Sequence, residues 1–284
     1  MKLRISFKKY YPVNMYYISC NLCGKDETKI ILKQPNSEYF PRTIVRCLNC
    51  GLVYMNPQPE YKELLKIYQE NSSEDISSPS PEKVIPEELL YPYPPNIRIP
   101  LRLSFLKKMM KPGKLLDVGC ASGEFLHYAK LAGWEGEGIE PSFVIADITH
   151  KKTGLPIYRG TLEDFSEKEE IFDLITMFDV IEHVADPKTD IKRAYQLLKI
   201  NGMIAISTPN IGCQRYWMQK DKWRGFTESR EHIFFFSART LSDLLIKCGF
   251  KIKRRLTRKI SPVLWRWLVY FGLGNVLEIY AQKI

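Results

Sequence analysis

The chain contains 284 residues, of which 45% are hydrophobic and 26% are charged, and its formal net charge is +10. This composition is that of a globular protein, and it excludes a disordered tail, a collagen-like repeat and a coiled-coil rod. The length is sufficient for two domains. The positive charge is concentrated in residues 1–9 and 247–259. Such a basic stretch either contacts RNA, anionic lipid or a phosphorylated substrate, or forms a solvated edge strand.

The sequence shows no recognisable targeting or membrane segment. The first twenty residues lack the apolar core of a signal peptide, and no apolar run reaches the ~18 residues of a membrane span. Residues 265–277 come nearest, but they include Arg266 and two glycines. We therefore expect a cytoplasmic protein, whose cysteines are thiols or metal ligands rather than disulfides.

The first motif along the chain is a quartet of cysteines, Cys20, Cys23, Cys47 and Cys50. They form two Cys-x-x-Cys pairs, and each pair is followed by glycine, which permits a tight knuckle. Two matched pairs predict a structural, four-coordinate Zn²⁺ site in a zinc-ribbon module over residues 1–60, with a basic N-terminal arm. A redox-active dithiol is the alternative.

Residues 61–100 are predicted to contain a helix followed by a Ser/Pro-rich joint, because proline prevents a continuous helix or a central strand. From residue 101 to 284 short strands and helices alternate, which predicts an α/β domain with a largely parallel sheet covered by helices on both faces. The predicted strands are residues 114–118, 134–140, 156–159, 172–178, 202–208, 251–256 and 275–281, and the later helices are residues 188–199 and 241–247.

A glycine-containing turn follows the first predicted strand of this domain. Asp117 lies at the end of the strand, and Gly119 and Gly123 flank small residues before a helix begins. Small residues allow a ligand to approach the backbone, and the helix N-terminus offers free N–H groups. The turn is neither a P-loop nor a dinucleotide-binding GxGxxG motif. About twenty residues on, Glu140 ends the second strand, where a carboxylate can accept both hydroxyls of a ribose.

These motifs together resemble one family. The runs LLDVGCASGEFL, GIEPS, FDLITMFDVIEHVADP, LLKINGMIAISTPN and EHIFFFSARTLSDLLIKCGF resemble, in order and spacing, those of class I S-adenosylmethionine-dependent methyltransferases. The similarity covers about residues 100–284 and is greatest to ubiquinone-biosynthesis O-methyltransferases and to methyltransferases of glycan pathways. It implies a Rossmann-like, seven-stranded sheet in which the last strand, residues 275–281, is antiparallel.

The resemblance also implies roles for individual residues in binding S-adenosylmethionine. Ala121 and Thr161 depart from the family pattern, since many relatives have glycine and aspartate there. The implied contacts are Asp117, Gly119 and Gly123 at the methionine end, Glu140 at the ribose, the Leu162 N–H at the adenine, and Phe178 packed on the cofactor.

The candidate catalytic residues are Asp179, His183 and His232. In ubiquinone-pathway relatives an acidic-x-x-Glu-His run is associated with a divalent metal, so the run from Asp179 to His183 suggests Mg²⁺ that orients a hydroxyl. The same run also ends a strand and begins a helix in metal-free relatives. His232 is a candidate general base because the pKa of histidine lies near neutrality, or else it makes a structural hydrogen bond.

The expected reaction is O-methylation of a small-molecule or lipid-linked acceptor, with a hydroxyl of a glycan-pathway sugar favoured. Residues 213–226 combine aromatic and cationic side chains that suit sugar, lipid headgroup or RNA contacts. Residues 261–273 are apolar and Trp-rich, which suggests packing on the core, on a partner or on a membrane surface. An rRNA or tRNA methyltransferase is the first alternative, and a non-catalytic module that retains the cofactor fold is the second.

Overall fold

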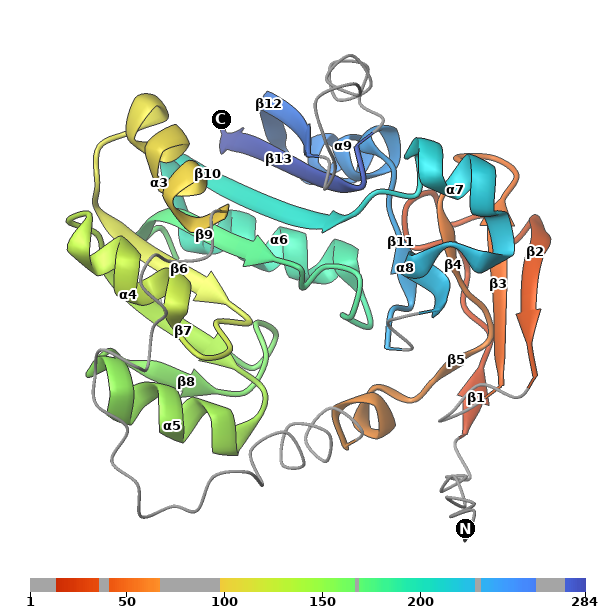
Figure 1. Cartoon of the computed structure of the whole chain (residues 1–284), viewed down its shortest axis with the longest axis horizontal. Helices are drawn as coiled ribbons and strands as arrows, with labels where there is room; N and C mark the ends of the chain where they lie inside the picture. The colour runs from red at the N-terminus through yellow and green to blue at the C-terminus, as the bar shows by residue number, and fades with distance from the viewer. Residues whose placement is uncertain (1–13, 36–40, 67–97, 167–168, 228–230, 259–273) are drawn as a thin grey trace, which may run out of the picture.

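The computed structural model describes residues 14–35, 41–66, 98–166, 169–227, 231–258 and 274–284 (Figure 1). It consists of a larger α/β part built around one mixed sheet and a smaller N-terminal β module that carries the four patterned cysteines. The two parts lie side by side in Figure 1, with the N-terminal strands on the right. This arrangement confirms the predicted α/β class with a small N-terminal module.

The larger part contains a seven-stranded sheet with the order β12-β13-β10-β9-β6-β7-β8. The five strands from β10 to β8 are parallel, and β13 is antiparallel to both of its neighbours. The antiparallel final strand is thus confirmed. The strands are β6 (Lys114–Val118), β7 (Glu135–Glu140), β8 (Ile157–Arg159), β9 (Phe172–Phe178), β10 (Leu198–Pro209), β12 (Phe250–Arg258) and β13 (Val276–Lys283).

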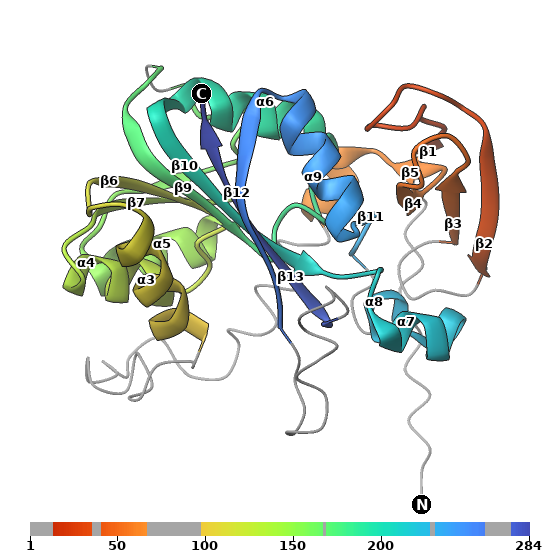
Figure 2. The ribbon, with the colours of Figure 1, turned by 90° about the horizontal axis from the view of Figure 1, so that it is seen from above.

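Helices cover both faces of this sheet. Figure 2 shows α6 (Pro187–Leu197) and α9 (Ala238–Lys247) on one face, and α3 (Arg98–Met109) and α4 (Glu124–Leu131) on the other. A further helix, α5 (Phe143–Thr153), connects β7 to β8. Helix α6 begins with a proline after Asp186, whose carboxylate accepts the Thr189 N–H at 2.9 Å. This is a favourable N-terminal cap, because it satisfies an N–H group that has no partner within the helix.

The connection from α6 to β10 differs from the expected one. Residues 188–199 were expected to be helical, with the next strand beginning at residue 202, whereas α6 ends at Leu197 and β10 begins at Leu198. Asn201 has a positive φ of 65°, and the pairing of β10 with β9 shifts between Leu198 and Met203. The Asn-Gly pair therefore forms an irregularity within a strand rather than the end of a helix.

The N-terminal module contains a four-stranded antiparallel sheet, and one of its strands, β11, comes from the α/β part of the chain. Its order is β11-β4-β3-β2, and a separate pair joins β1 to β5. Phe234 pairs with Tyr54, so β11 extends the sheet from the far end of the chain. The strands are β1 (Met15–Tyr16), β2 (Thr28–Gln34), β3 (Arg42–Cys47), β4 (Val53–Met55), β5 (Gln58–Pro59) and β11 (Phe234–Phe235).

The first cysteine knuckle is fixed to the α/β part by polar contacts. Between Cys20 and Cys23, the Asn21 side chain donates to Asp186 at 2.7 Å and accepts the Lys188 N–H at 3.0 Å. The Lys247 ammonium of α9 donates to the Leu22 carbonyl at 3.0 Å. The knuckle thus contacts the start of α6 and the end of α9.

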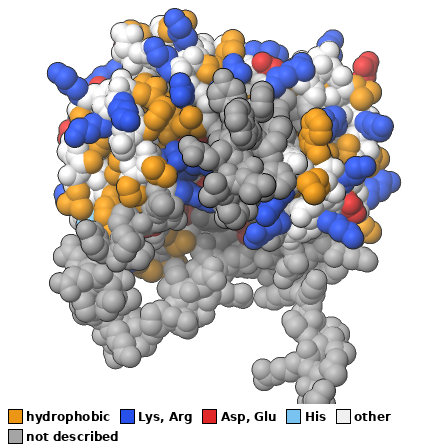
Figure 3. All heavy atoms as spheres, turned by 45° about the horizontal axis from the view of Figure 1, so that its top comes forward, with side chains coloured by type: hydrophobic (Ala, Val, Ile, Leu, Met, Phe, Trp, Pro, Cys, Tyr) orange, Lys and Arg blue, Asp and Glu red, His pale blue; other side chains and the backbone are white. Residues whose placement is uncertain are grey.

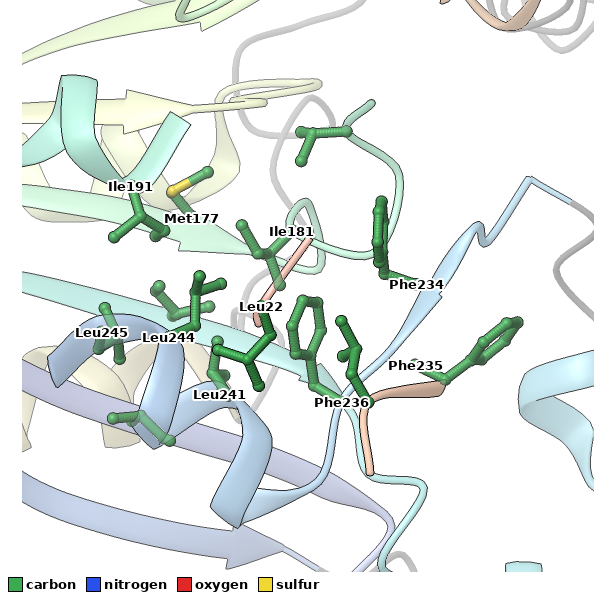
Figure 4. Close-up of a cluster of buried hydrophobic side chains, with 14 of the residues drawn as sticks. Leu22, Met177, Ile181, Ile191, Phe234, Phe235, Phe236, Leu241, Leu244 and Leu245 are labelled. Atoms are coloured by element: carbon green, nitrogen blue, oxygen red, sulfur yellow. The ribbon is translucent and has the colours of Figure 1, made fainter. Parts of the chain in front are cut away.

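A continuous apolar core joins the two parts. Figure 4 shows Leu22 of the first knuckle beside Ile181, Phe236 and Leu241, all of which are buried. Removing this much apolar surface from water provides a large favourable contribution to folding. The N-terminal module therefore shares a hydrophobic core with the α/β part.

The basic segment near the C-terminus forms the edge strand β12. Lys251, Lys253, Arg254 and Arg255 are exposed on it. Exposed cations on an edge strand discourage pairing with another sheet. Lys and Arg side chains are also spread over the face in Figure 3, among hydrophobic ones. In the part of the chain that is described, no helix is long and apolar enough to cross a bilayer.

Candidate active site

A cavity of about 390 Å³ opens at the carboxyl ends of the central strands. Gly119 follows β6, Leu162 follows β8 and Phe178 ends β9, and all three line it. Tyr61 and Leu64, from helical residues 61–66 after the N-terminal module, form another wall. The strand order reverses between β6 and β9, and such a point is where open α/β sheets bind ligands.

The turn after β6 adopts a conformation that requires glycine. Gly119 has a φ of +69°, and a Cβ atom there would lie 2.5 Å from Cγ2 of Val180. Gly123 has a φ of +74° and precedes α4. The turn therefore passes close to the β9 end without side chains that would fill the cavity.

Glu140 anchors this turn from the end of β7. Its carboxylate accepts the Ala121 N–H at 3.0 Å and the Ser142 N–H at 2.9 Å. The residue is fully buried, and its neighbours Ile139 and Pro141 line the cavity. Glu140 thus orders the backbone on which a ribose is expected to lie.

Asp117 and Arg102 form a buried polar layer behind the cavity wall. The Thr176 hydroxyl donates to Asp117 at 2.6 Å. Burial raises the pKa of Asp117 to about 7, while Thr176 and Arg102 oppose this increase. The Arg102 guanidinium lies 3.8 Å from the centre of the Phe178 ring and donates to Glu278. Phe178 therefore packs against Arg102 on one side and lines the cavity.

Asp179 lines the cavity with an exposed side chain, in a conformation with a φ of 59°. Its carboxylate accepts a hydrogen bond from the Ser207 hydroxyl at 3.0 Å, and the Arg98 guanidinium lies 3.8 Å away. The Arg102 guanidinium donates to the same Ser207 hydroxyl at 2.8 Å. Asp179 is thus connected by hydrogen bonds to the buried polar layer.

Glu182, His183 and His232 form a compact cluster next to Asp179. The two imidazole rings are 4.6 Å apart, and His232 Nε2 lies 3.8 Å from Glu182 Oε1. Among the described residues, no group lies in good hydrogen-bonding geometry to either oxygen of the buried Glu182, and the Thr208 hydroxyl is the side-chain donor that tends to lower its pKa. Burial, together with the charge of Asp179, raises the pKa of Glu182 to about 8. Burial lowers the pKa of His183 to about 4 and that of His232 well below its usual value. Both imidazoles are therefore neutral at pH 7.

This cluster does not have the donor set that Mg²⁺ prefers. One ligand atom from each of the three side chains lies within 4.8 Å of the others, so the group could hold an ion. Mg²⁺ takes oxygen ligands and keeps several waters, whereas two imidazoles and one carboxylate suit zinc-like ions. The Mg²⁺ suggested for the run from Asp179 to His183 is not supported, because among the described residues Asp179 does not belong to the group that could hold an ion, and the group that does form has two imidazoles and one carboxylate.

The structure divides the predicted site residues into two layers. Gly119, Leu162, Phe178, Asp179 and His183 line the cavity. The residues behind that wall are Asp117, Gly123, Glu140 and His232. His232 contacts the ring of His183, and its Nδ1 lies 3.3 Å from the Gly225 carbonyl oxygen. The structure thus brings all of the predicted residues to one region, with His183 between His232 and the cavity.

The four patterned cysteines come together as predicted. The Cys20 and Cys50 sulfurs are 3.4 Å apart, and those of Cys23 and Cys47 are 3.5 Å apart. Tetrahedral coordination with Zn–S bonds of about 2.3 Å places sulfurs about 3.8 Å apart. Gly24 and Gly51 have positive φ angles, and their N–H groups bond back to the carbonyls of Cys20 and Cys47. The four thiols therefore fit a structural zinc ion.

Sequence reasoning missed several residues that shape the site. Arg42 of β3 is buried and donates to the main-chain carbonyls of Phe226 and His232 at 3.1 and 2.8 Å. Tyr61 and Asp190 line the cavity. No local pattern identifies them, because each acts on a segment that is distant in sequence.

Comparison with known proteins identifies the family. Residues 95–254, more than half of the chain, match a family model described as a methyltransferase domain. The chain belongs to this family, and it is an S-adenosylmethionine-dependent methyltransferase with the class I fold.

Two curated relatives and two solved structures illustrate the similarity. The ubiquinone biosynthesis O-methyltransferase of Ruegeria pomeroyi is 30% identical over 169 residues, which cover 55% of this chain and 67% of that protein. Its counterpart in Actinobacillus pleuropneumoniae is 33% identical over 138 residues, which cover 44% and 59%. The chain thus spans about two thirds or less of these relatives.

Among solved structures, a methyltransferase of Thermotoga maritima, described as a possible histamine N-methyltransferase, is 27% identical with a TM-score of 0.51. The match covers 66% of this chain and 89% of that one. A Listeria monocytogenes structure, described as a putative S-adenosylmethionine-dependent methyltransferase, is 19% identical with a TM-score of 0.51, and it covers 64% and 97%. The second match shows the fold alone.

Proposed function

We propose that the protein transfers a methyl group to a hydroxyl of a small-molecule or lipid-linked acceptor, and that a glycan-pathway sugar is the favoured acceptor. The observation that carries this proposal is the position of Asp179 and His183 on the wall of the cavity that begins at the Gly119 turn. The curated relatives are named as O-methyltransferases, which supports an oxygen acceptor.

In this proposal the chain binds the cofactor along the ends of three adjacent strands. Gly119 borders the methionine end, with Asp117 and Gly123 behind it, and Glu140 positions the ribose through the turn that its carboxylate orders. The adenine lies at the β8 end, against the Leu162 N–H, and Phe178 packs on the cofactor from β9. S-adenosylmethionine supplies an electrophilic methyl group when it is bound.

The acceptor is held beside Asp179 and His183 with its hydroxyl directed into the cavity. His183 is neutral at pH 7 and can accept the hydroxyl proton as the oxygen attacks. Asp179 stabilises the imidazolium that results, since its charge favours protonation of His183. His232 holds the His183 ring in place through their edge-to-face contact.

We also propose that residues 1–60 form a zinc-ribbon module whose Zn²⁺ is structural, that residues 61–100 join it to the catalytic domain, and that the protein is cytoplasmic. All four zinc ligands are then cysteines, so no coordination position is left for a substrate. Residues 261–273, which suggested a membrane contact, lie outside the described residues.

The rRNA or tRNA alternative is based on RNA recognition by the zinc ribbon joined to this fold. The exposed cations of β12, among them Lys251 and Arg255, are a further basic surface that RNA could contact. In the sheet, β13 and β10 separate β12 from β9, where the catalytic candidates lie. A nucleic acid bound to β12 would therefore be separated by two strands from the strand that leads into the cavity. This relationship favours a small acceptor.

The test is a methylation screen with isotopically labelled S-adenosylmethionine, sugar nucleotides, lipid-linked glycans and RNA, followed by mapping of the methylated atom. We expect an O-methylated sugar, at least a hundredfold loss of turnover in His183→Ala, and unchanged affinity for S-adenosylhomocysteine in that variant. Methylation of RNA alone, or wild-type turnover by His183→Ala, would refute the proposal. Binding without turnover of any acceptor class would favour the non-catalytic alternative.

A further inference from the structure

One wall of the cavity comes from outside the methyltransferase domain. Tyr61, Leu64 and Leu65 line the cavity and belong to helical residues 61–66. This helical segment lies before the part of the chain that matches the family model. Leu64 is buried in the core cluster that also contains Cys20 of the first cysteine knuckle. The N-terminal part of the chain therefore supplies both the cysteine quartet and a part of the ligand cavity.

A strand pair connects the first knuckle to this wall. β1 lies shortly before Cys20 in the sequence, and it pairs with β5, which lies shortly before Tyr61. The Asn56 side chain, next to β5, accepts the Ile18 N–H at 3.1 Å and donates to the Ile18 carbonyl at 3.0 Å. The position of the wall thus depends on the conformation of the chain that leads into the first knuckle.

The same knuckle supports a second wall of the cavity through α6. The Asn21 side chain donates to the Asp186 carboxylate at 2.7 Å and accepts the Lys188 N–H at 3.0 Å. Val184 and Asp190, which lie on either side of this contact in the sequence, both line the cavity, whereas Asn21 does not. Two walls of the cavity are therefore attached to the first knuckle.

A metal ion in the quartet would fix the conformation of the first knuckle. Cys20 and Cys23 flank Asn21, and their sulfurs lie close to those of Cys50 and Cys47 in the second knuckle. A four-coordinate ion holds both knuckles in one geometry, and its binding free energy stabilises the folded arrangement of the segments that carry the ligands. Occupation of the quartet therefore restricts the chain that leads to both walls of the cavity.

We propose that zinc binding at the cysteine quartet and cofactor binding in the cavity are thermodynamically coupled, so that each ligand binds more tightly when the other is present. The inference rests on the zinc and cofactor sites proposed above, and it gives the N-terminal module a role in ligand affinity as well as in stability. A ligand binds more tightly to walls that are already held in the bound arrangement, because binding then costs less conformational entropy. Coupling between two sites usually changes each affinity by about 5- to 150-fold.

The test measures both affinities with the full chain. Competition with a chelator of known affinity gives the zinc affinity, with and without saturating S-adenosylhomocysteine. Calorimetric titration gives the affinity for S-adenosylhomocysteine in zinc-loaded and zinc-free protein. We expect each ratio to be about 5- to 150-fold and the two ratios to be equal, because linkage between binding sites is reciprocal. Ratios close to one, in protein that circular dichroism shows to be folded, would overturn the coupling.

Variants that retain zinc separate the coupling from loss of the fold. Asn21→Ala removes the contacts with α6 but keeps all four cysteines, so it should contain one zinc ion per chain. It should bind S-adenosylhomocysteine at least about fivefold more weakly than wild type. Leu48→Ala is the matched control, because Leu48 has the same position in the second knuckle and is 61% exposed, and it should bind like wild type. If the zinc-free protein does not fold, these variants decide, and wild-type affinity in Asn21→Ala would overturn the inference.

A second pair of variants tests the wall itself, and the underlying sites fail in different ways. Leu64→Ala should weaken binding of S-adenosylhomocysteine to zinc-loaded protein, whereas Lys62→Ala, at an exposed position of the same helical segment outside the cavity wall, should not. Equal binding by these two variants would overturn the connection between the module and the ligand. Failure of zinc-loaded wild-type protein to bind S-adenosylhomocysteine would instead overturn the proposed cofactor site, and a purified wild-type protein that binds no zinc would overturn the proposed metal site.

Discussion

The guanidinium of Arg42 donates a hydrogen bond to the main-chain carbonyl of His232 at 2.8 Å, although the two residues are 190 positions apart. Arg42 belongs to the N-terminal module, and His232 belongs to the segment that carries the catalytic candidates. The same guanidinium donates to the Phe226 carbonyl at 3.1 Å. The N-terminal module thus helps to hold the segment that carries His232, which the proposed function places on the acceptor side of the active site.

Replacing Arg42 by methionine should destabilise the fold and disturb the acceptor side more than the cofactor side. The substitution removes the donors from two buried carbonyls, and we expect a loss of about 2–4 kcal/mol in the free energy of unfolding. Chemical denaturation measures this loss. Hydrogen exchange should increase in residues 224–227 and 231–236, while affinity for S-adenosylhomocysteine should change less than threefold.

Arg46→Met is the matched control for Arg42→Met. Arg46 lies on the same strand and donates to the Tyr216 hydroxyl, but its side chain is only partly buried. Its loss should cost less than about 1 kcal/mol. Equal losses in the two variants would contradict the proposed role of Arg42.

The cysteine quartet should make the stability of the whole chain depend on zinc. Cys20→Ser combined with Cys47→Ser should abolish the zinc content of the purified protein. It should also lower stability by more than about 3 kcal/mol, or roughly 6 °C or more in Tm. The effect should reach the α/β part, because Asn21 and Leu22 of the first knuckle contact α6 and α9.

Metal analysis and thermal denaturation test this dependence on zinc. Cys248→Ser is the control, since Cys248 is buried but lies outside the quartet, and it should retain one zinc per chain. If the double variant still contained one zinc ion per chain, the ion would be bound outside the cysteine quartet.

Local sequence patterns predicted the fold because its elements are encoded by contiguous residues. Residues 114–118 form an apolar strand that is followed by a glycine turn, and residues 172–178 form a second apolar strand that is followed by Asp179. Both β6 and β9 therefore have the predicted bounds. The zinc-binding role of the paired cysteines was also predictable, because two Cys-x-x-Cys pairs at this spacing are typical of metal sites.

The residues that escaped prediction depend on contacts between distant segments. β11 is a short, fully apolar segment whose strand conformation depends on pairing with β4. Asp190 occupies a helical position where an acid usually faces solvent, and only the fold places it on a cavity wall. Helical periodicity predicted the position of α6 in the sequence, but it could not predict which part of the protein its buried face contacts.

The buried carboxylate of Asp190 should lower stability as the pH rises. Its pKa is about 7 in the folded protein, above the 3.8 of an exposed aspartate, because of burial and the charges of Glu163, Asp186 and Asp164. The folded state therefore favours the protonated form, and stability decreases between about pH 4 and pH 7 by up to about 1.4 kcal/mol per pH unit.

Asp190→Asn removes this dependence, so the variant should be more stable than wild type at pH 8 and similar at pH 4. Urea denaturation at several pH values gives the difference, in which the parallel contribution of Asp117 cancels. A variant that is less stable than wild type at pH 8 would contradict this account.

The Gly119 turn offers a sharp test of the cofactor site, because the chain contains a matched glycine elsewhere. Gly119 and Gly154 have φ angles of +69° and +64°, but a Cβ would meet Val180 at the first position and open space at the second. Gly154→Ala should cost about 1 kcal/mol in stability, as expected for the left-handed conformation alone, and leave cofactor binding unchanged. Gly119→Ala should cost about 1–3 kcal/mol more, because a neighbour must move.

Gly119→Ala should also reduce affinity for S-adenosylhomocysteine by more than tenfold, because the added methyl group lies at the turn that borders the cavity. Calorimetric titration of both alanine variants, after their folding is verified by circular dichroism, separates backbone strain from loss of the site. If both variants bind S-adenosylhomocysteine as wild type does, the methionine end of the cofactor does not lie on this turn. If both lose affinity equally, the effect comes from destabilisation of the fold rather than from contact with the cofactor.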